Sequence, residues 1–412
     1  MDAIIKTCAG LDIHLNTIVA CVLSGELDRT PKKEIKEFST TTKSLLELLD
    51  YLTEKGCTHV AMESTGVYWK PVWNILESGG FNIIIANAHN IKNLPGRKTD
   101  IKDAEWIAKL LRCGLIDKSF IPSTEIRDLR YLTRYRRRLC GDLNKEMNHI
   151  HKTLQDANIK LSSVLSDIFC VTGTKVLLRI MNNEPLDWAF VNSIYTGAIG
   201  ASLKAKPDEF YEAINGRIRT FHRKMLKVHY DHILFIQSQI EEIESQIEEA
   251  LEEHQESLEI LTSIPGIDVK SASVIIAEIG TDMTQFPSAS SISSWAGVSP
   301  GNNESAGKKK SSKIVKGNKW LLCVLCQCAW AASMKKGSYC NKKYWNMVSR
   351  MGKQKAIVAI AHYQLRLCYT LLKNKKKYEE RNYDYLKKKE TQRTQRLIKE
   401  LQKSGYNIQK IV

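Results

Sequence analysis

The segment AIIKTCAGLDIHLNTIVACVLS, residues 3–24, decides the fold of the first part of the chain. It contains two runs rich in β-branched and apolar residues, interrupted between Gly10 and Asn16, as in a strand hairpin. Two more apolar runs, THVAMEST (58–65) and FNIIIANA (81–88), are typical of buried strands. Helical patterns alternate with these strands, over residues 43–55, 69–76 and 103–111. The alternation predicts an α/β domain over residues 1–120.

Two long helical segments are expected further along the chain. Residues 127–155 carry a row of arginines on a helical pattern. From Leu226 to Leu261, apolar residues recur at alternating steps of three and four, with glutamates between them. This pattern of about four to five heptads predicts a coiled coil or a long helical hairpin, and a coiled coil would make the protein a dimer or larger. An ordinary amphipathic helix packed on its own domain is the alternative reading.

A chain of 412 residues is too long for one compact core and is expected to form two or three domains. We predict a first domain over 1–158, which includes the arginine-rich helix, and a linker with the coiled coil over 159–260. A mostly α-helical domain with a basic tail is predicted over 261–412. Residues 160–220 carry no pattern that indicates a role.

The net charge of +16 is concentrated in the last quarter of the chain. Residues 300–412 hold 27 Lys and Arg against 6 Asp and Glu, whereas residues 1–299 hold 34 against 39. A basic excess gathered in one region favours a polyanion-binding surface, and nucleic acid is the commonest such partner. A lysine-rich tail can also be merely solvated, so charge alone does not decide the function.

The cysteines and the hydropathy pattern indicate a cytoplasmic protein without a membrane partner. The 11 cysteines are scattered, odd in number and mostly set in apolar runs. Their densest group, Cys323, Cys326 and Cys328, lacks a second ligand pair at metal-site spacing, so buried small residues are the better interpretation. The chain has no apolar run of membrane-spanning length and no signal-peptide pattern.

Four carboxylates stand where a metal site could form. Asp12 ends the first strand in GLDIH, and Glu63 ends another strand in AMESTG. Asp100 and Asp103 begin a helix in KTDIKDAEWIA, three residues apart and therefore on one face. Hard oxygen ligands at strand ends suit two Mg²⁺ ions, which can clamp a scissile phosphate. Helix caps and turn residues are the alternative interpretation of the same four positions.

A second group of motifs surrounds a serine. LTSIPGIDVKSASVIIAEIG (261–280) predicts two helices joined by the turn of a helix-hairpin-helix, whose amides can hold a DNA phosphate. Asp268 stands where such turns usually carry a second glycine, so a purely structural turn is equally compatible. Downstream, Ser305 lies between a Pro-Gly-Asn loop at 299–303 and Lys308, Lys309 and Lys310. A lysine-rich loop can polarise the target of a serine nucleophile, although most loop serines serve turns only.

These motifs, taken in order, resemble a known family. GLDIH, ESTG, RKTDIKDA, IPGI, FPSASSISSWAGVSP and ESAGK followed by KGNKWL are similar to the DEDD-type insertion-sequence transposases. That family comprises bridge-RNA-guided serine recombinases whose N-terminal domain is RuvC-like, that is, RNase H-like. The resemblance therefore implies an α/β RuvC-like N-terminal domain, a coiled-coil middle and a mostly helical transposase domain.

The resemblance also implies roles for individual residues. Asp12, Glu63, Asp100 and Asp103 match the family's Mg²⁺-binding carboxylates, and Ser305 matches the serine that forms a covalent phosphoserine link to DNA. It implies a composite active site shared between subunits, a dimer of dimers, and a noncoding bridge RNA that pairs with donor and target DNA. A prokaryotic, nucleoid-associated location follows from that activity. Family members often have glycine after the serine, where this chain has Ala306 and then Gly307.

Two further expectations complete the analysis. The predicted nucleic-acid contacts are made by basic residues of the long helix and of the serine loop: Arg127, Arg130, Arg134, Arg137, Arg138, Lys308, Lys309, Lys310 and Lys313. Pairing of this helix with coiled-coil glutamates is the alternative role for its arginines. A hydrolytic RuvC-like junction endonuclease without a covalent serine step is the alternative function.

Overall fold

The computed structural model describes residues 3–64, 66–86, 100–116, 119–196, 203, 205–301, 303–305, 308–311, 314, 316–380 and 384–406. The chain forms two compact units, Met1–Ile121 and Pro122–Val412, and each is described by itself. The arginine-rich helix, which the sequence analysis grouped with residues 1–158, lies in the second unit and packs along a second long helix there.

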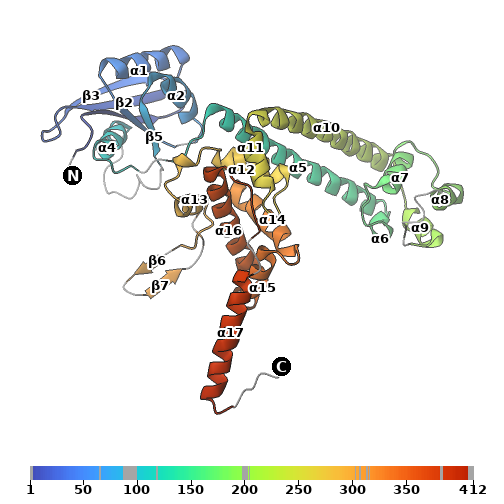
Figure 1. Ribbon diagram of the computed structural model, residues 1–412. Coiled ribbons are helices and arrows are strands. Elements are labelled where there is room, and N and C mark those ends of the chain that lie inside the picture. Colours follow the sequence, from blue (N-terminus) through green and yellow to red (C-terminus); the bar gives the residue numbers. More distant parts are fainter. Residues whose placement is uncertain are drawn as a thin grey trace. The chain divides into compact units, whose positions relative to one another are not determined.

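The first unit is built on a five-stranded mixed sheet of order β3-β2-β1-β4-β5 (Figure 1). β2 pairs antiparallel with both β1 and β3, whereas β4 is parallel to β1 and β5 is parallel to β4. The strands are β1 Thr7–Ile13, β2 Thr17–Ser24, β3 Lys32–Ser39, β4 His59–Glu63 and β5 Asn82–Ala86. The predicted hairpin and both predicted buried strands are confirmed, while β3 was not anticipated.

Helices cover both faces of this sheet. α1 (Thr42–Glu54) and α2 (Trp69–Leu76), which runs into the short η1 (Glu77–Gly79), share one apolar core with the sheet. α4 (Asp100–Arg112) packs on the opposite face, against a separate cluster. This arrangement confirms the predicted α/β fold class.

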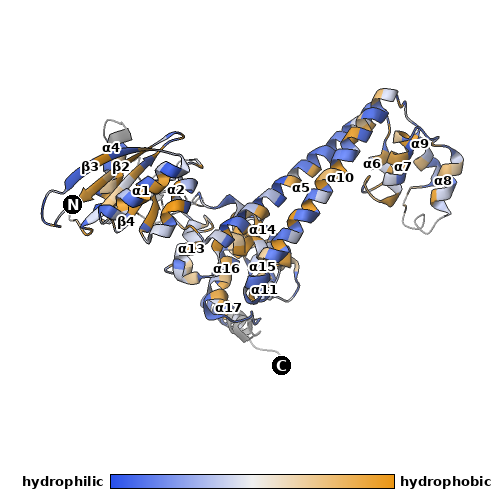
Figure 2. Ribbon diagram, turned by 90° about the horizontal axis from the view of Figure 1, so that it is seen from above, coloured by the Kyte–Doolittle hydropathy of each residue, from blue (hydrophilic) through white to orange (hydrophobic). Residues whose placement is uncertain are grey.

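Two long helices, α5 (Thr124–Asp156) and α10 (Thr220–Ala250), lie side by side in the second unit (Figures 1 and 2). They run antiparallel, since Arg136 pairs with Glu244 near one end and Glu146 pairs with His229 further along. The apolar seam of α10 therefore packs against α5 of the same chain, as in the predicted helical hairpin. The expectation of one helix up to residue 261 is wrong, because α10 ends at Ala250. A 3-10 turn, η3 (Glu252–His254), separates it from the next helix, α11 (Gln255–Thr262).

Short helices at one end of this pair share an apolar core with it, in which Phe210 and Val176 pack together with Leu154 of α5 and Leu226 of α10. They are α6 Leu161–Val164, α7 Val171–Met181, α8 Trp188–Tyr195 and α9 Pro207–Ile214. The described residues between 160 and 220 thus form a small helical bundle on the α5–α10 pair.

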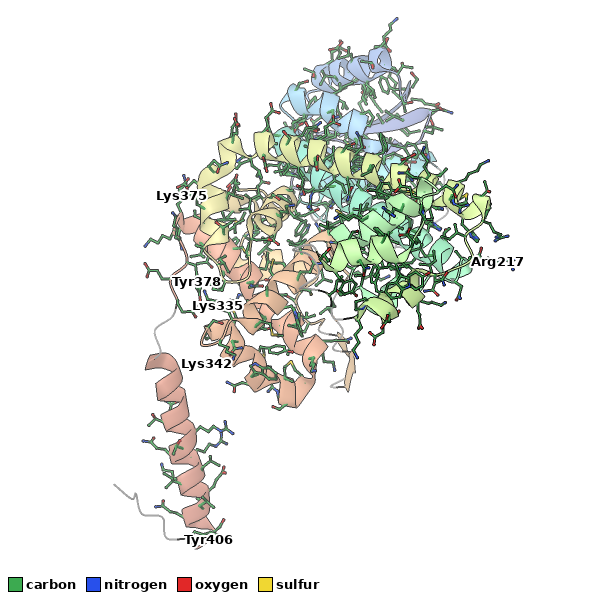
Figure 3. The ribbon with its side chains drawn as sticks, turned by 90° about the vertical axis from the view of Figure 1, so that its right-hand side faces the viewer. Arg217, Lys335, Lys342, Lys375, Tyr378 and Tyr406 are labelled. Atoms are coloured by element: carbon green, nitrogen blue, oxygen red, sulfur yellow. The ribbon has the colours of Figure 1, made fainter. Side chains whose placement is uncertain are left out.

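The remaining described residues of the second unit are mostly helical and include one small hairpin. Its helices are α11 Gln255–Thr262, α12 Val269–Ile279, η4 Met283–Gln285, α13 Ala289–Trp295, α14 Lys319–Met334, α15 Tyr339–Met351, α16 Lys353–Asn374 and α17 Asp384–Lys403. The hairpin pairs β6 Asn303–Ser305 with β7 Lys308–Ser311. Basic side chains including Lys335, Lys342 and Lys375 lie along one side of this part (Figure 3). The mostly helical C-terminal part is as predicted.

The cysteines are free thiols, and six of them are buried, including Cys8, Cys57 and Cys368. Burial raises the pKa of the Cys8 and Cys57 thiols to about 12, so these groups stay protonated and behave as small apolar residues. Within the described residues, no helix is both long and apolar enough to cross a bilayer.

Candidate functional site

The acidic site begins with two carboxylates on neighbouring parallel strands. β1 and β4 pair with Leu11 opposite Met62, so the register, continued by one residue, sets Asp12 beside Glu63. Side chains alternate between the faces of a strand, and Gly10 and Ala61, two residues earlier, both face α4. Asp12 and Glu63 therefore share the α4 face at the carboxyl ends of their strands. Only 8% of the Asp12 surface is exposed.

Close packing at Gly10 brings the start of α4, which carries Asp100 and Asp103, toward Asp12 and Glu63. A Cβ added to Gly10 would lie 2.4 Å from the carbonyl oxygen of Ala104 and 2.4 Å from the amide nitrogen of Ala108. The backbone of α4 therefore crosses β1 in direct contact, two residues before Asp12. Asp103 precedes Ala104 on this helix, and Asp100 is its first residue. The first turn of α4 thus lies over the strand ends that carry Asp12 and Glu63.

Ion pairs fix α4 on the sheet. Glu105 of α4 pairs with Lys33 of β3 at 3.0 Å and with Lys109 at 2.6 Å. Hydrogen bonds from Lys109 and Lys33 hold the pKa of the Glu105 carboxyl below its usual range. Glu105 is therefore a structural carboxylate, distinct from the strand-end pair.

The carboxylates have the chemistry of a divalent-cation site. Oxygen ligands at the ends of adjacent strands suit Mg²⁺, and two like charges on one sheet face favour a cation between them. Asp12 Oδ2 also lies 3.2 Å from Nε2 of His14, a residue that sequence reasoning did not select. Among the side chains that the structure describes, no three acidic, histidine or cysteine groups are close enough to hold a metal ion. The Asp100 side chain lies outside that set.

Ser305 lies in the second unit, at the end of β6, where it pairs with Lys308 of β7. Its side chain and those of Lys308, Lys309 and Lys310 are outside the described part, as are Lys313, Ala306 and Gly307 altogether. The base of this loop is tightly closed, because a Cβ on Gly317 would lie 2.3 Å from the amide nitrogen of Gly297. The loop that carries Ser305 is therefore anchored where it leaves α13 and where it enters α14.

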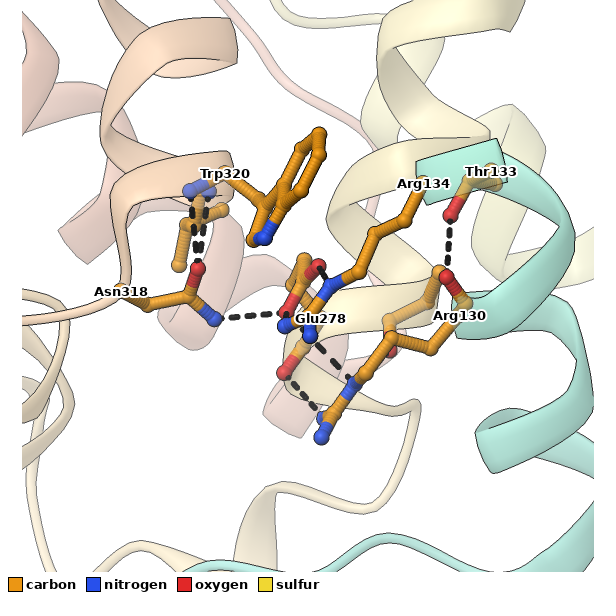
Figure 4. A network of polar contacts seen from close by, with 8 residues as sticks. Arg130, Thr133, Arg134, Glu278, Asn318 and Trp320 are labelled. Carbon is orange, nitrogen blue, oxygen red and sulfur yellow. Dashed lines mark hydrogen bonds and ion pairs between the residues drawn. The ribbon is translucent and has the colours of Figure 1, made fainter. Parts of the chain in front are cut away.

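A buried carboxylate links this anchor to α5 (Figure 4). Glu278 of α12 is fully buried and accepts two hydrogen bonds from Arg134 of α5, at 2.7 and 2.8 Å. It also accepts one from the Asn318 amide at 2.6 Å. The Asn318 side-chain oxygen in turn caps α14 by accepting from the amides of Trp320 and Leu321. One chain of hydrogen bonds therefore runs from α5 through α12 to the end of the serine loop.

The predicted nucleic-acid arginines are used in different ways. Arg130 donates to the carbonyl oxygens of Ala277 and Glu278, and burial lowers the pKa of its guanidinium to about 10, an effect that Glu278 opposes. Together with Arg134, it holds α12 against α5. Arg127 donates to the Pro122 carbonyl oxygen at the start of its helix. Arg138 is exposed, and Arg137 is described below with the cavity that it lines.

The predicted turn at IPGI is present and joins α11 to α12, with Asp268 as the N-cap of α12. Gly266 has a φ of +86° and faces α14, since its Cβ would lie 2.4 Å from the Cys328 carbonyl oxygen. The glycine is thus required by helix packing. The structural interpretation of this turn accounts for its sequence.

The fold and these carboxylates define a class of protein. Its members have an α/β domain with carboxylates at the ends of adjacent parallel strands, followed by a basic helical domain. Comparison with known families is consistent with it. A transposase family model of the DEDD, IS110 type matches residues 9–159, and the model described as "Transposase IS116/IS110/IS902 family" matches residues 258–346. The chain belongs to the IS110 family of DEDD transposases and is an enzyme that acts on DNA.

Two solved structures are also similar to part of the chain. RuvC from Thermus thermophilus matches at 14% identity and a TM-score of 0.23, covering 28% of this chain and 100% of its own. The same protein in complex with a Holliday junction substrate matches at 13% identity and a TM-score of 0.21, with coverages of 28% and 100%. The comparison with curated proteins found no match.

Proposed function

We propose that this transposase joins donor and target DNA by strand exchange through a covalent phosphoserine intermediate, with Ser305 as nucleophile. The observation that carries the proposal is the placement of Asp12 beside Glu63, beneath the first turn of α4. In this proposal the acidic motif of the family acts at the carboxyl ends of these two strands. Ser305 lies within the second family match, which supports its assignment.

The metal in this proposal is Mg²⁺, held by Asp12, Glu63, Asp100 and Asp103. The strand-end pair fits such an ion, because both residues offer carboxylate oxygens from the same sheet face. When bound, Mg²⁺ would stabilise the charge that develops on a scissile phosphate. The protein's own contribution is to hold the carboxylates in place through the sheet register and the contact of α4 with Gly10.

The serine step conserves bond energy. The Ser305 hydroxyl oxygen attacks phosphorus, forming a serine–phosphate ester as the bond to a deoxyribose oxygen breaks, and that leaving oxygen takes up a proton. A hydroxyl of the exchanged DNA end then attacks the phosphoserine, restoring a phosphodiester and the serine hydroxyl. Because each step exchanges one phosphate ester for another, strand exchange needs no ATP.

The partners in this proposal are donor DNA, target DNA, a noncoding bridge RNA and further copies of the chain. Exposed Arg138 and the basic serine loop are suited to phosphate contacts. The proposal includes self-association as a dimer of dimers with composite active sites. Pairing of copies through α10 is supported by Phe221, Val228 and Phe235. These residues recur every seven positions on α10, and their exposed fractions are 59, 59 and 60%.

The first test is a reaction with labelled DNA, RNA transcribed from the sequence that flanks the gene, and Mg²⁺, resolved on denaturing gels. We expect a DNA-linked protein band with the wild type and none with Ser305→Ala or Asp12→Asn. Ser311→Ala, in the same hairpin, and Asp28→Asn, in an exposed loop, are the matched controls and should retain the band.

A hydrolytic nuclease is the second candidate, and one observation favours it. Asp12, Glu63 and α4 all belong to the first compact unit, so the acidic site needs no residue of the second unit to form. Free cut DNA that persists in Ser305→Ala without any adduct would establish this alternative. Light scattering that shows a monomer in the presence of RNA and DNA would exclude the composite site.

A further inference from the structure

A cavity of about 480 Å³ lies between α5, α12 and α14 in the second unit. Arg134, Arg136 and Arg137 line it from α5, Lys270 from the first turn of α12, and Trp320 from the first turn of α14. Its volume falls in the range of roughly 300–1,000 Å³ that is typical of pockets for small organic groups. The cavity is thus large enough for one nucleotide.

The lining of the cavity carries an excess of positive charge, with three arginines and Lys270 against Asp268. Two carboxylates outside the lining each serve two cations: Glu278 is shared by Arg134 and Arg130, and Glu244 is shared by Arg136 and Lys270. Each carboxylate therefore faces two cations. Asp268 adds one negative charge, but it serves as the N-cap of α12 by accepting from the Ser271 amide at 2.8 Å. An anionic ligand would restore the balance.

Arg137 is the cation best placed to bind that ligand. Its guanidinium lies 5.7 Å from the ring centre of Trp320 and donates to the Cys323 sulfur at 2.6 Å. No ion pair joins Arg137 to a carboxylate within the described residues. A guanidinium held beside an indole keeps its remaining N–H groups available for a phosphate.

Trp320 supplies the second element of recognition. It is partly exposed in the cavity, and the guanidinium of Arg134 lies 5.6 Å from its ring centre. Arg134 is itself fixed by the buried Glu278, and Asn318 fixes the backbone that carries the indole. A preorganised aromatic ring beside a cation is the usual platform for an unpaired base with its phosphate.

We propose that this cavity binds one unpaired nucleotide of a single strand, its phosphate on Arg137 and its base on Trp320. The inference rests on the proposed function in that the bridge RNA is the expected source of the strand. Single-stranded DNA offers the same phosphate and base, so the test has an arm for each. Occupancy of the cavity would contact the start of α14, directly after the serine loop.

The experiment measures binding of a 12-nucleotide oligouridylate RNA and an oligothymidylate DNA to the full chain over a range of salt concentrations. Arg137→Gln should weaken binding about tenfold and reduce the salt slope by about one. Trp320→Leu should weaken binding about tenfold with an unchanged salt slope, while Trp320→Phe stays within about threefold of the wild type. Lys152→Gln removes an exposed charge from the same helix outside the cavity and is the matched control.

The outcomes separate the sources and the hypotheses. If the variants bind only the RNA probe more weakly, the cavity is assigned to RNA. If they bind both probes more weakly, it is assigned to single strands of either kind. Arg137→Gln and Trp320→Phe keep the test valid if Trp320→Leu unfolds, which thermal unfolding will show. Wild-type binding by Arg137→Gln and Trp320→Leu would overturn the nucleotide pocket while leaving the serine adduct untouched. If the variants bind more weakly as expected but the wild type forms no serine–DNA adduct, the proposed function alone is refuted.

Discussion

The two acidic centres of this chain, the pair Asp12–Glu63 and the single carboxylate Glu278, are positioned by different means. Glu278 is fully buried and is held by side chains, through the guanidinium of Arg134 and the amide of Asn318. Asp12 and Glu63 are held by backbone, through the pairing of β1 with β4 and the contact of α4 with Gly10.

This difference separates a structural carboxylate from a candidate ligand. A buried carboxylate surrounded by arginines is already neutralised, and its charge stabilises the contact between α5 and α12. Two carboxylates placed side by side by backbone repel each other, and a bound cation relieves that repulsion. Removing a negative charge should therefore change stability in opposite directions at the two centres.

The largest effect is expected for Glu278→Gln. The substitution keeps the shape of the side chain but leaves Arg130 and Arg134 without their buried counter-charge, which should lower the free energy of unfolding by about 3 kcal/mol. Urea denaturation measures this value. Glu248→Gln on the exposed face of α10 is the control and should change it by less than about 0.5 kcal/mol. A decrease in the free energy of unfolding as small as that of the control would show that Glu278 is not needed for the contact between α5 and α12.

Gly10→Ala should come second, with a loss of about 2 kcal/mol and of Mg²⁺-dependent cleavage. The new Cβ meets the α4 backbone at 2.4 Å, so the helix that carries Asp100 and Asp103 must move. Unfolding and DNA cleavage are measured on the same sample.

Gly141→Ala is the matched control for that substitution. No heavy atom lies within 4 Å of a Cβ built on Gly141, which is in the middle of α5. Alanine there should raise stability by up to about 1 kcal/mol, because it favours helix more than glycine does. Equal stability changes at both glycines would mean that the contact between α4 and β1 is not tight.

Glu244→Gln should have a smaller, pH-dependent effect. Hydrogen bonds from Lys270 and then Arg136 lower the pKa of the Glu244 carboxyl, so its stabilisation is present above the unfolded pKa of about 4.3. It is lost as the pH falls through the lower folded pKa. We expect the variant to be less stable by at most about 1 kcal/mol at pH 7, since these partners are partly exposed, and by nothing measurable near pH 2. A deficit that does not change with pH would assign the effect to packing.

The smallest effect has the opposite sign. In EDTA, Asp12→Asn should raise the free energy of unfolding by about 0.5 kcal/mol, because the repulsion from Glu63 that it removes outweighs the weak contact with half-exposed His14. Added Mg²⁺ should raise the Tm of the wild type but not of the variant. Destabilisation in EDTA, as at Glu278, would remove the distinction between the two centres.

Much of the fold could be predicted because its signals are local. The hairpin at residues 3–24 and the helix at 69–76 are set by alternation and by helical periodicity, and both are present. Strand β3, Lys32–Ser39, was missed because it is an edge strand in which only Phe38 is buried and charged residues hide the alternation. The break after Ala250 was missed because the heptad spacing continues across it.

The candidate site was also predicted only in part from the sequence. Placing Asp12 and Glu63 at strand ends required only the sequence pattern, and the parallel pairing of β1 with β4 sets them next to each other. The partner of Arg134 could not be predicted, since Glu278 lies 144 residues away along the chain. The sequence analysis therefore assigned five arginines of α5 to one nucleic-acid surface, whereas packing takes two of them, Arg130 and Arg134, into the contact with α12.

The sequence alone determined the strand hairpin, the acidic strand ends, the basic C-terminal region and the transposase motifs. Periodicity, charge and short motifs are properties of neighbouring residues and can be read without knowing what packs against them. Tertiary structure decided that α10 packs on α5 of the same chain, that α4 crosses β1 at Gly10, and that Glu278 is neutralised by α5. These contacts join residues far apart in sequence. They form only when distant segments pack together, and no local sequence preference predicts them.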